Sequence, residues 1–240
     1  MNCETVTITG ADDMTDMYEL VDLSAEFPFV EWGILVSARN EGRQRFPSRH
    51  WIELFSGQVR RHGMKVATHI CGEWVRELLV GELNWNCLPF GLLPVSWRVQ
   101  INTHGGVYPS TTAMWDRMDE LRGKKFIFQW EGVNDHLARA TIQRGGLSAL
   151  SVLFDKSGGM GLVPDEWPKQ LSGIYCGYAG GLGPHNISQQ LEKLEHLCQW
   201  EYWIDMEQNV RTDDGEKLDL AKVRTVLETV RDWFPKEVCA

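Results

Sequence analysis

The chain has 240 residues, with 24 Lys and Arg against 33 Asp and Glu, and therefore a net charge of −9. This length, with 43% hydrophobic residues, is enough to bury a large core without disulfide support. The acidic balance and the lack of a block of Lys and Arg exclude a general nucleic-acid binder, because phosphate neutralisation requires a basic face. No linker or low-complexity stretch divides the chain, so we expect one domain over residues 1–240.

The sequence carries no signal for a membrane or for export. No segment approaches the roughly 20 consecutive apolar residues of a membrane span, and the first residues lack the basic and apolar regions of a secretory signal. The six cysteines are scattered without a CxxC pair, as is usual for reduced thiols. We therefore expect a cytoplasmic protein that has neither a membrane nor nucleic acid as its partner.

Apolar segments rich in Val, Ile, Phe and Trp alternate with amphipathic segments along the chain. The apolar segments have the composition of strands, which we expect at residues 5–10, 29–36, 65–71, 97–102, 125–130, 150–155, 173–179 and 202–206. The amphipathic segments predict helices at residues 13–23, 48–61, 72–80, 111–122, 133–144, 187–199 and 218–233. The stretch 81–94 is expected to be irregular and to cross the outside of the fold. Asn186 offers a cap for the helix from residue 187.

Eight strands separated by helix-length connections indicate a parallel sheet, because a parallel return needs a crossover. Eight such units within 240 residues favour a sheet that closes on itself. We therefore predict an α/β fold consisting of a single (β/α)₈ TIM barrel. An open, doubly wound parallel sheet is the alternative that the pattern leaves open.

Polar side chains are concentrated where the predicted strands end. In a (β/α)₈ barrel these carboxyl ends meet on one face, and the active site forms there. The polar residues at or just after the strand ends are Thr9, Arg39, Arg43, Arg45, His69, Cys71, Gln100, Asn102, His104, Gln129, Asp155, Asp205 and Glu207. The three arginines share one loop, where they can clamp a carboxylate or a phosphate or form solvated ion pairs.

Three of these side chains are candidates for proton transfer. Asp205 and Glu207 are two residues apart and therefore share one face of a strand, and two close carboxylates raise one pKa into a range useful for acid–base chemistry. His69 has a reference pKa near 6.5 that suits proton transfer. For all three, a structural hydrogen-bonding role is the alternative.

A zinc site is a further alternative. His69, Cys71 and His104 lie at neighbouring strand ends, and His and Cys are suitable ligands for Zn²⁺. The required four-ligand geometry is not evident from the sequence, so we expect no metal.

Two glycine-rich loops follow predicted strands, SGGMG at 157–161 and GGLGP at 180–184. Glycines let backbone N–H groups converge on an anion, and the N-terminus of a following helix favours negative charge. The second loop follows the seventh strand, a frequent phosphate position in these barrels. We expect phosphate at Gly159, Gly161, Gly180 and Gly181, with simple turns as the alternative.

Three motifs occur in order in the last third of the chain: LFD with GGMG (153–161), AGGLGPHNI (179–187) and IDMEQNVRT (204–212) with Gly215, Lys217 and Asp219. They resemble the LLD–GGxG, AGGLxPxN and VDxSSGVET–G–KD segments of phosphoribosylanthranilate isomerase, a small (β/α)₈ enzyme of tryptophan biosynthesis. Looser matches precede them at QIN with HG (100–105), RFPS (45–48) and VTITG (6–10). The chain therefore resembles a divergent member of this family.

The resemblance implies a cofactor-free Amadori rearrangement of a phosphorylated sugar conjugate. It implies Asp155 as the general acid, Arg45 as the holder of a carboxylate, and a phosphate site that includes the backbone near Gln208 and Asn209. The residues that we expect to contact substrate are Arg45, Thr9, Asn102, Gln129 and Asp205.

One position departs from the family pattern at the centre of its chemistry. The family's general base is a cysteine, and Thr9 stands in its place. A threonine hydroxyl is too weak a base near neutral pH, so the base must have another origin. The candidates are His69 first, Glu207 second and Cys71 third.

Two functional hypotheses follow from these observations. In the first, the protein is an isomerase that acts on a phosphorylated sugar conjugate by acid–base chemistry. In the second, the barrel has lost catalysis and sequesters or senses a phosphorylated, nucleotide-like ligand. Both predict a small phosphorylated molecule as the partner and no organic cofactor, in a monomer or homodimer.

Overall fold

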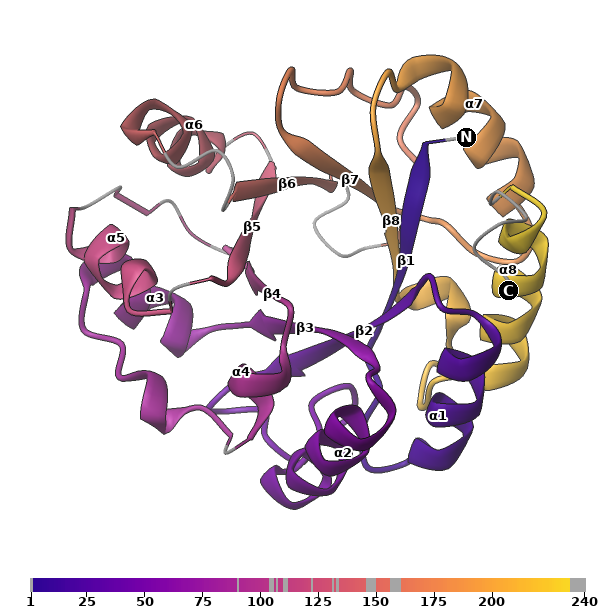
Figure 1. Ribbon diagram of the computed structural model, residues 1–240, viewed down its shortest axis with the longest axis horizontal. Coiled ribbons are helices and arrows are strands. Elements are labelled where there is room, and N and C mark those ends of the chain that lie inside the picture. The colour runs from indigo at the N-terminus through magenta and orange to yellow at the C-terminus, as the bar shows by residue number, and fades with distance from the viewer. Residues whose placement is uncertain are drawn as a thin grey trace.

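The computed structural model describes residues 2–89, 91–103, 106, 108–109, 112–121, 123–130, 132, 134–145, 150–155 and 161–233. Eight parallel strands close into a barrel in which each strand pairs with the next and β8 pairs with β1 (Figure 1). The strands are β1 (Cys3–Thr9), β2 (Val30–Val36), β3 (Lys65–Ile70), β4 (Arg98–Ile101), β5 (Lys125–Trp130), β6 (Leu150–Asp155), β7 (Tyr175–Ala179) and β8 (Tyr202–Met206). The predicted TIM barrel is confirmed, and the open-sheet alternative is wrong.

Helices surround the ring of strands on its outside (Figure 1). They are α1 (Met17–Glu26), α2 (Arg49–His62), α3 (Glu73–Val80), α4 (Leu92–Val95), α5 (Thr112–Asp119), α6 (Asp135–Arg144), α7 (Ile187–Leu197) and α8 (Leu220–Arg231), with 3-10 turns η1 (Trp85–Cys87) and η3 (Gln208–Val210). On α8 the buried residues are Val223, Val226, Leu227 and Val230, the spacing of an amphipathic helix. In the described part of the chain, no helix is long and apolar enough to cross a membrane.

The strands contribute to two separate cores, because successive side chains of a strand point to opposite sides. On β1, Val6 and Ile8 pack in the outer core with the helices. Thr7 and Thr9, which alternate with them, hydrogen-bond to side chains of β2 and β8 inside the barrel. A small apolar cluster also fills the interior and consists of Ile127, Leu153, Ala179 and Trp203.

Element boundaries follow local capping. The predicted strands 125–130, 150–155 and 202–206 are confirmed to the residue. The helix predicted from residue 13 begins instead at Met17, because the Asp16 side chain accepts a hydrogen bond from the Tyr18 backbone and caps the helix there.

The prediction that 81–94 is irregular holds for most of its described residues but overlooks two short helical elements. This stretch contains η1 and the first residues of α4. The side chain of Asn84 accepts from the backbone N–H of Asn86 and so starts η1, and Gly91 precedes α4 in the left-handed conformation, at φ 88°. Pro94 is compatible with α4 because it lies in the first turn, where its missing N–H has no helical partner.

A buried ion pair crosses the barrel interior below the strand ends. Arg98 of β4 donates from Nε to Glu31 Oε2 of β2 at 3.1 Å, and its Nη2 donates to the other carboxylate oxygen. Thr7 of β1 also donates to Glu31 Oε1, at 3.0 Å. The guanidinium stacks on Trp203, with Cζ 4.3 Å from a ring centroid. Ala67, in register with Arg98 on the intervening strand, leaves space for these long side chains.

Breaking this pair should strongly destabilise the barrel. Both partners are about 1% exposed, so Arg98→Met leaves a buried carboxylate without its counter-charge, and we expect a loss of about 3–5 kcal/mol in the free energy of unfolding. Replacing both partners, as Glu31→Leu with Arg98→Met, should recover most of this loss. Denaturant unfolding measures each value.

The matched control is Arg224→Met, which breaks an ion pair between Arg224 and Glu26 on the surface, where both side chains are at least 40% exposed. We expect this change to stay within about 1 kcal/mol. Equal losses for Arg98→Met and Arg224→Met would contradict the role given to the buried pair.

Candidate functional site

A cavity of about 300 Å³ opens at the carboxyl ends of the strands. It collects most of the residues predicted from the sequence, namely Thr9, Arg45, His69, Cys71, Gln100, Asn102, Gln129, Asp155, Gly161, Gly180, Gly181, Asp205, Glu207, Gln208 and Asn209. Gly159 and His104 lie outside the described residues. Arg39 and Arg43, the other two arginines predicted for this site, do not line the cavity; the Arg39 side chain is 77% exposed and lies 3.9 Å from Glu73. The other described residues that the sequence proposed for one site share this cavity.

Six apolar lining residues were not predicted as site residues: Leu35, Phe46, Leu153, Ala179, Leu182 and Met206. Alternation along β2 could have placed Leu35 inside the barrel, since it lies two residues from Gly33 and four from Glu31. Phe46 and Leu182 come from loops, and no strand or helix period indicates the direction of a loop side chain.

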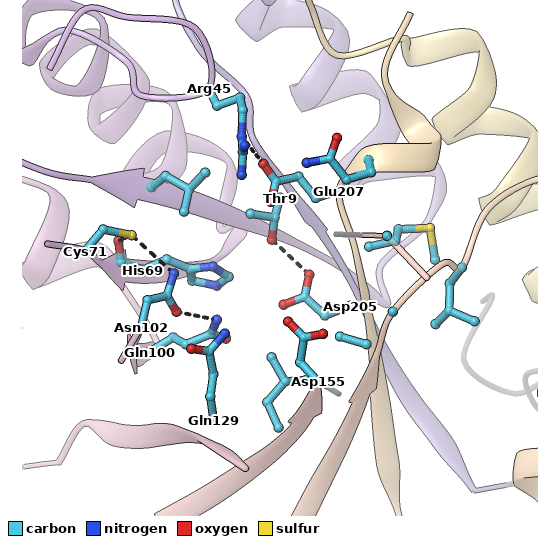
Figure 2. Close-up of a pocket in the computed structure, with 18 of the residues that line it drawn as sticks. Thr9, Arg45, His69, Cys71, Gln100, Asn102, Gln129, Asp155, Asp205 and Glu207 are labelled. Carbon is cyan, nitrogen blue, oxygen red and sulfur yellow. Dashed lines mark hydrogen bonds and ion pairs between the residues drawn. The ribbon is translucent and has the colours of Figure 1, made fainter. Parts of the chain in front are cut away.

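Two buried carboxylates, Asp155 and Asp205, stand at the same level of the barrel. Asp155 of β6 is in register with Ala179 of β7, which is in register with Asp205 of β8. The small side chain of Ala179 leaves the space between them open, and Figure 2 shows the two carboxylates pointing toward one another in the pocket. Each residue is about 5% exposed, so the pair is largely removed from bulk water.

Thr9 of β1 holds one of these carboxylates. Thr9 Oγ1 donates a hydrogen bond to Asp205 Oδ1 at 2.9 Å (Figure 2). Burial raises the pKa of Asp205 well above its ordinary value, and the negative charge of Glu207 raises this pKa further. The hydrogen bond from Thr9 acts in the opposite direction and lowers the pKa, but it does not outweigh burial. Asp205 is therefore a stronger proton acceptor than an ordinary aspartate.

Glu207 forms an ion pair with Arg45 at the pocket mouth (Figure 2). Arg45 has a left-handed backbone, at φ 73°, and its N–H donates to Asp12 Oδ2 at 2.7 Å. This bond from the loop after β1 holds the loop after β2 in place and directs the guanidinium to Glu207. Burial raises the pKa of Glu207, while the charge of Arg45 lowers it.

His69 lies fully inside the barrel, where Gly33 makes room for it. A Cβ at Gly33 would stand 2.2 Å from Thr9 Oγ1 and 2.8 Å from His69 Cε1, so a side chain there would displace both groups. Neither ring nitrogen of His69 has a hydrogen-bond partner among the described residues. Burial, assisted by the positive charge of Arg98, lowers the pKa of His69 to about 3, so the imidazole is neutral near pH 7.

A chain of side-chain hydrogen bonds runs along the ends of β3 and β4. Gln100 Nε2 donates to Asn102 Oδ1 at 2.8 Å, and Asn102 Nδ2 donates to Cys71 Sγ at 3.2 Å (Figure 2). The thiol in turn donates weakly to the carbonyl of His69 at 3.7 Å. Burial raises the pKa of Cys71 to about 12, although the bond from Asn102 lowers it. The thiol therefore keeps its proton near neutral pH.

The loops after β6, β7 and β8 meet closely at Gly181. Its carbonyl accepts from Asn209 Nδ2 at 2.8 Å and from Asn186 Nδ2 at 2.9 Å. Its backbone is left-handed, at φ 64°, and a Cβ would stand 2.4 Å from the nitrogen of Val163, so glycine is required. Asn186 occupies the predicted cap position of α7 but makes no cap hydrogen bond there, because its side chain instead holds the loop at Gly181 and Gly183.

The described residues contain no group of three or more His, Cys, Asp and Glu side chains that could hold a metal ion. His104, the third member of the hypothetical zinc site, falls outside them. Within this part of the chain, Cys71 instead serves the hydrogen-bond chain of Gln100 and Asn102.

No protein-family model and no curated protein matches the sequence. Solved structures, in contrast, are similar to the fold. A phosphoribosyl anthranilate isomerase from Thermus thermophilus aligns over 96% of this chain and 100% of its own, with TM-score 0.59 and 15% identity. Another such isomerase, in complex with reduced 1-(o-carboxyphenylamino)-1-deoxyribulose 5-phosphate, covers 95% and 98%, with TM-score 0.56 and 12% identity.

A truncated 3-deoxy-D-arabino-heptulosonate 7-phosphate synthase from Thermotoga maritima is similar to the same degree. It covers 99% of this chain and 88% of its own, with TM-score 0.58 and 11% identity. At these identities the likeness establishes the barrel fold. The predicted resemblance to phosphoribosylanthranilate isomerase is thus confirmed as a likeness of fold.

The depressed pKa of His69 predicts an acid-sensitive contribution to stability. Between its ordinary pKa of 6.5 and about 3, the unfolded chain binds a proton at His69 that the folded protein excludes. Stability is therefore complete above the ordinary pKa and is lost as the pH falls. Between about pH 7.5 and about pH 5, the wild type should lose about 2 kcal/mol more than His69→Asn.

Denaturant unfolding of the two proteins at both pH values measures this difference. In addition, the His69 ring resonances should not titrate over this interval in NMR spectra. Equal losses in the two proteins, or a titration near the ordinary pKa, would contradict the neutral, buried imidazole.

Proposed function

We propose that this protein is an isomerase that performs an Amadori-type rearrangement on a phosphorylated sugar conjugate. The observation that carries the proposal is the buried carboxylate pair, Asp155 and Asp205, on either side of Ala179. The glycine-rich loop at Gly180 and Gly181 lines the same cavity. Two carboxylates in different environments can divide the acid and base roles of one reaction.

In this proposal Asp155 donates a proton to the furanose ring oxygen of the substrate. The bond between C1 and that oxygen breaks while the nitrogen lone pair forms a C1=N bond. Asp205 removes the proton from C2 to give an enolamine, which loses its enol proton as C1 gains one. The product is an amino ketone with the same atoms as the substrate, so the reaction requires no cofactor.

The base role falls to Asp205 for reasons of protonation and geometry. Its raised pKa makes it a competent proton acceptor, and Thr9 orients its carboxylate. His69, the first candidate from the sequence, has a pKa of about 3 and is a weak base; we give it a hydrogen-bonding role toward substrate. Glu207 is engaged in an ion pair, and the Cys71 thiol keeps its proton.

The phosphate of the substrate is assigned to the loops after β6, β7 and β8. Gly161, Gly180 and Gly181 have left-handed backbones, at φ 69°, 120° and 64°, and line the cavity with Gln208 and Asn209 at η3. Glycine backbones of this kind can turn N–H groups toward an anion. The similar solved structures include a barrel bound to a deoxyribulose 5-phosphate derivative and a 7-phosphate synthase, which supports phosphorylated ligands as the substrate class.

One observation favours the second candidate function, a barrel that binds its ligand without turnover. Thr9 replaces the family's cysteine, and its hydroxyl is engaged as a donor to Asp205. A protein that keeps the ligand cavity but lacks this base can still bind the ligand without converting it. The two functions differ in the fate of a bound conjugate. An isomerase converts it to product, whereas a binding barrel releases it chemically unchanged.

Removing either the acid, Asp155, or the base, Asp205, should greatly reduce turnover. We expect Asp155→Asn and Asp205→Asn each to lower kcat for a ribosyl- or ribulosyl-phosphate conjugate by about a hundredfold or more, with binding of ribulose 5-phosphate retained. Turnover is followed by mass spectrometry and ultraviolet absorbance, and binding by calorimetry.

Asp135→Asn on α6 is the matched control, because it removes a carboxylate that pairs with Arg139 on the outer helix, and its turnover should equal that of the wild type. Unchanged turnover in Asp155→Asn would overturn the mechanism. A ligand that co-purifies and is recovered chemically unchanged would favour the binding barrel.

The glycine loop offers a separate test of phosphate binding. Gly181→Ala forces a Cβ toward the Val163 nitrogen in a left-handed backbone, so the loop must shift, and we expect affinity for ribulose 5-phosphate to fall by about tenfold. Gly57→Ala in α2, where a Cβ meets nothing within 4 Å, is the control and should bind normally. Unchanged affinity in Gly181→Ala would remove this loop from the phosphate site.

A further inference from the structure

The cavity has two chemically different sides (Figure 2). Among the described lining residues, the charged side chains come from β6, from the loop after β2 and from β8 with the residue that follows it, whereas those at the ends of β3, β4 and β5 are uncharged. These uncharged groups, which we call the neutral wall, are His69, Gln100, Asn102 and Gln129. In the closed ring β3 and β4 lie across from β7 and β8, so a ligand with its phosphate at the glycine loops directs its other end to the neutral wall.

The neutral wall holds buried polar atoms that have no partner in the described protein. They are Gln100 Oε1 and both ring nitrogens of His69, and the two residues are about 3% and 1% exposed. The hydrogen bond from Gln100 Nε2 to Asn102 orients the amide of Gln100. The amide oxygen therefore points away from Asn102. Buried polar atoms are normally satisfied, so a bound ligand is the natural partner for these three.

The partners that these atoms require define the ligand group. Gln100 Oε1 accepts and therefore needs a donor. The neutral imidazole of His69 presents one donor and one acceptor, whichever tautomer it adopts. A group that satisfies both residues must both donate and accept hydrogen bonds. A carboxylate only accepts, so it would leave Gln100 Oε1 without a donor.

The charges around the cavity also disfavour a carboxylate. Among the described lining residues Arg45 is the single Lys or Arg, and it is already paired with Glu207. The Glu207 side chain is 17% exposed, so its charge is poorly screened and offsets the attraction of Arg45 for a second anion. Asp155 and Asp205 add further carboxylates to the same lining.

We infer that the ligand group opposite the phosphate is uncharged and carries both a hydrogen-bond donor and an acceptor, as a carboxamide does, and that a carboxylate is disfavoured there. This inference rests on the proposed function, because it assumes that a phosphorylated ligand spans the cavity. It names the class of conjugate on which the site acts. It also gives Glu207 a role in specificity, as the residue that neutralises Arg45.

The experiment compares two probes that differ in one group. The first is reduced 1-(o-carboxyphenylamino)-1-deoxyribulose 5-phosphate, the compound held by one of the similar isomerases, and the second is its o-carbamoyl counterpart. Calorimetry in a phosphate-free buffer gives both affinities for the purified protein, with ribulose 5-phosphate as the reference ligand. We expect the carboxamide probe to bind about tenfold or more tightly than the carboxylate probe.

Two variants test the cause of this preference. Glu207→Gln keeps the size of the side chain but frees the charge of Arg45, so the preference should shift by about tenfold toward the carboxylate probe. Gln100→Met removes the acceptor and should weaken only the carboxamide probe. Glu26→Gln, which breaks an ion pair with Arg224 on the outer helices, is the matched control and should leave the ratio of affinities unchanged.

The outcomes separate this inference from the proposed function. If ribulose 5-phosphate binds but the wild type prefers the carboxylate probe, the inference is overturned and the proposed function stands. If Glu207→Gln binds ribulose 5-phosphate normally and keeps the wild-type preference, the role of Glu207 is overturned. If neither probe nor ribulose 5-phosphate binds, the proposed function fails and this inference fails with it.

Discussion

The buried pair of Glu31 and Arg98 is the constraint around which the rest of the barrel interior is arranged. A charge in a low-dielectric interior is tolerated only when a counter-charge and hydrogen bonds replace its water. Thr7 supplies one such bond, and the Trp203 ring lies against the guanidinium. Small residues must flank such a pair, and Ala67 is one of them. The barrel interior below the pocket therefore contains a fixed layer of polar side chains, which we call the polar floor. In most barrels of this type, branched apolar side chains occupy this position.

The charge of this floor reaches the groups above it. Arg98 contributes to the low pKa of His69 and partly offsets the burial that raises the pKa of Asp205. The same cation thus adds to the burial that keeps the imidazole of His69 neutral, and it favours the ionised form of Asp205. A neutral His69 can both donate and accept hydrogen bonds, which a protonated ring cannot do. Burial is the larger cause of both pKa shifts, and Arg98 acts on His69 and Asp205 in addition to it.

Much of this site could be predicted from sequence because strand alternation is a local property. Asp155 and Asp205 end apolar strands, and the parallel order of the strands is enough to bring them to one face. The pairing of Arg45 with Glu207 could not be predicted in this way, since it depends on Asp12 holding a distant loop in a left-handed turn. The low pKa of His69 could not be predicted either, because it results from burial beside a cation of another strand. Local periodicity gives the position of a side chain, and tertiary packing gives its charge and partners.

The departures from the isomerase pattern are coupled to one another in the structure. Replacement of the family's cysteine by Thr9 removes a base, but it supplies the hydrogen bond that stabilises Asp205 as an anion. A serine of the pattern has become Glu207, which adds negative charge, yet that charge is balanced by Arg45, the residue expected to hold a carboxylate. At both positions, the residue that departs from the pattern contacts another residue of the pocket. These contacts agree with the inference that the ligand group opposite the phosphate is uncharged, because Glu207 already balances the charge of Arg45.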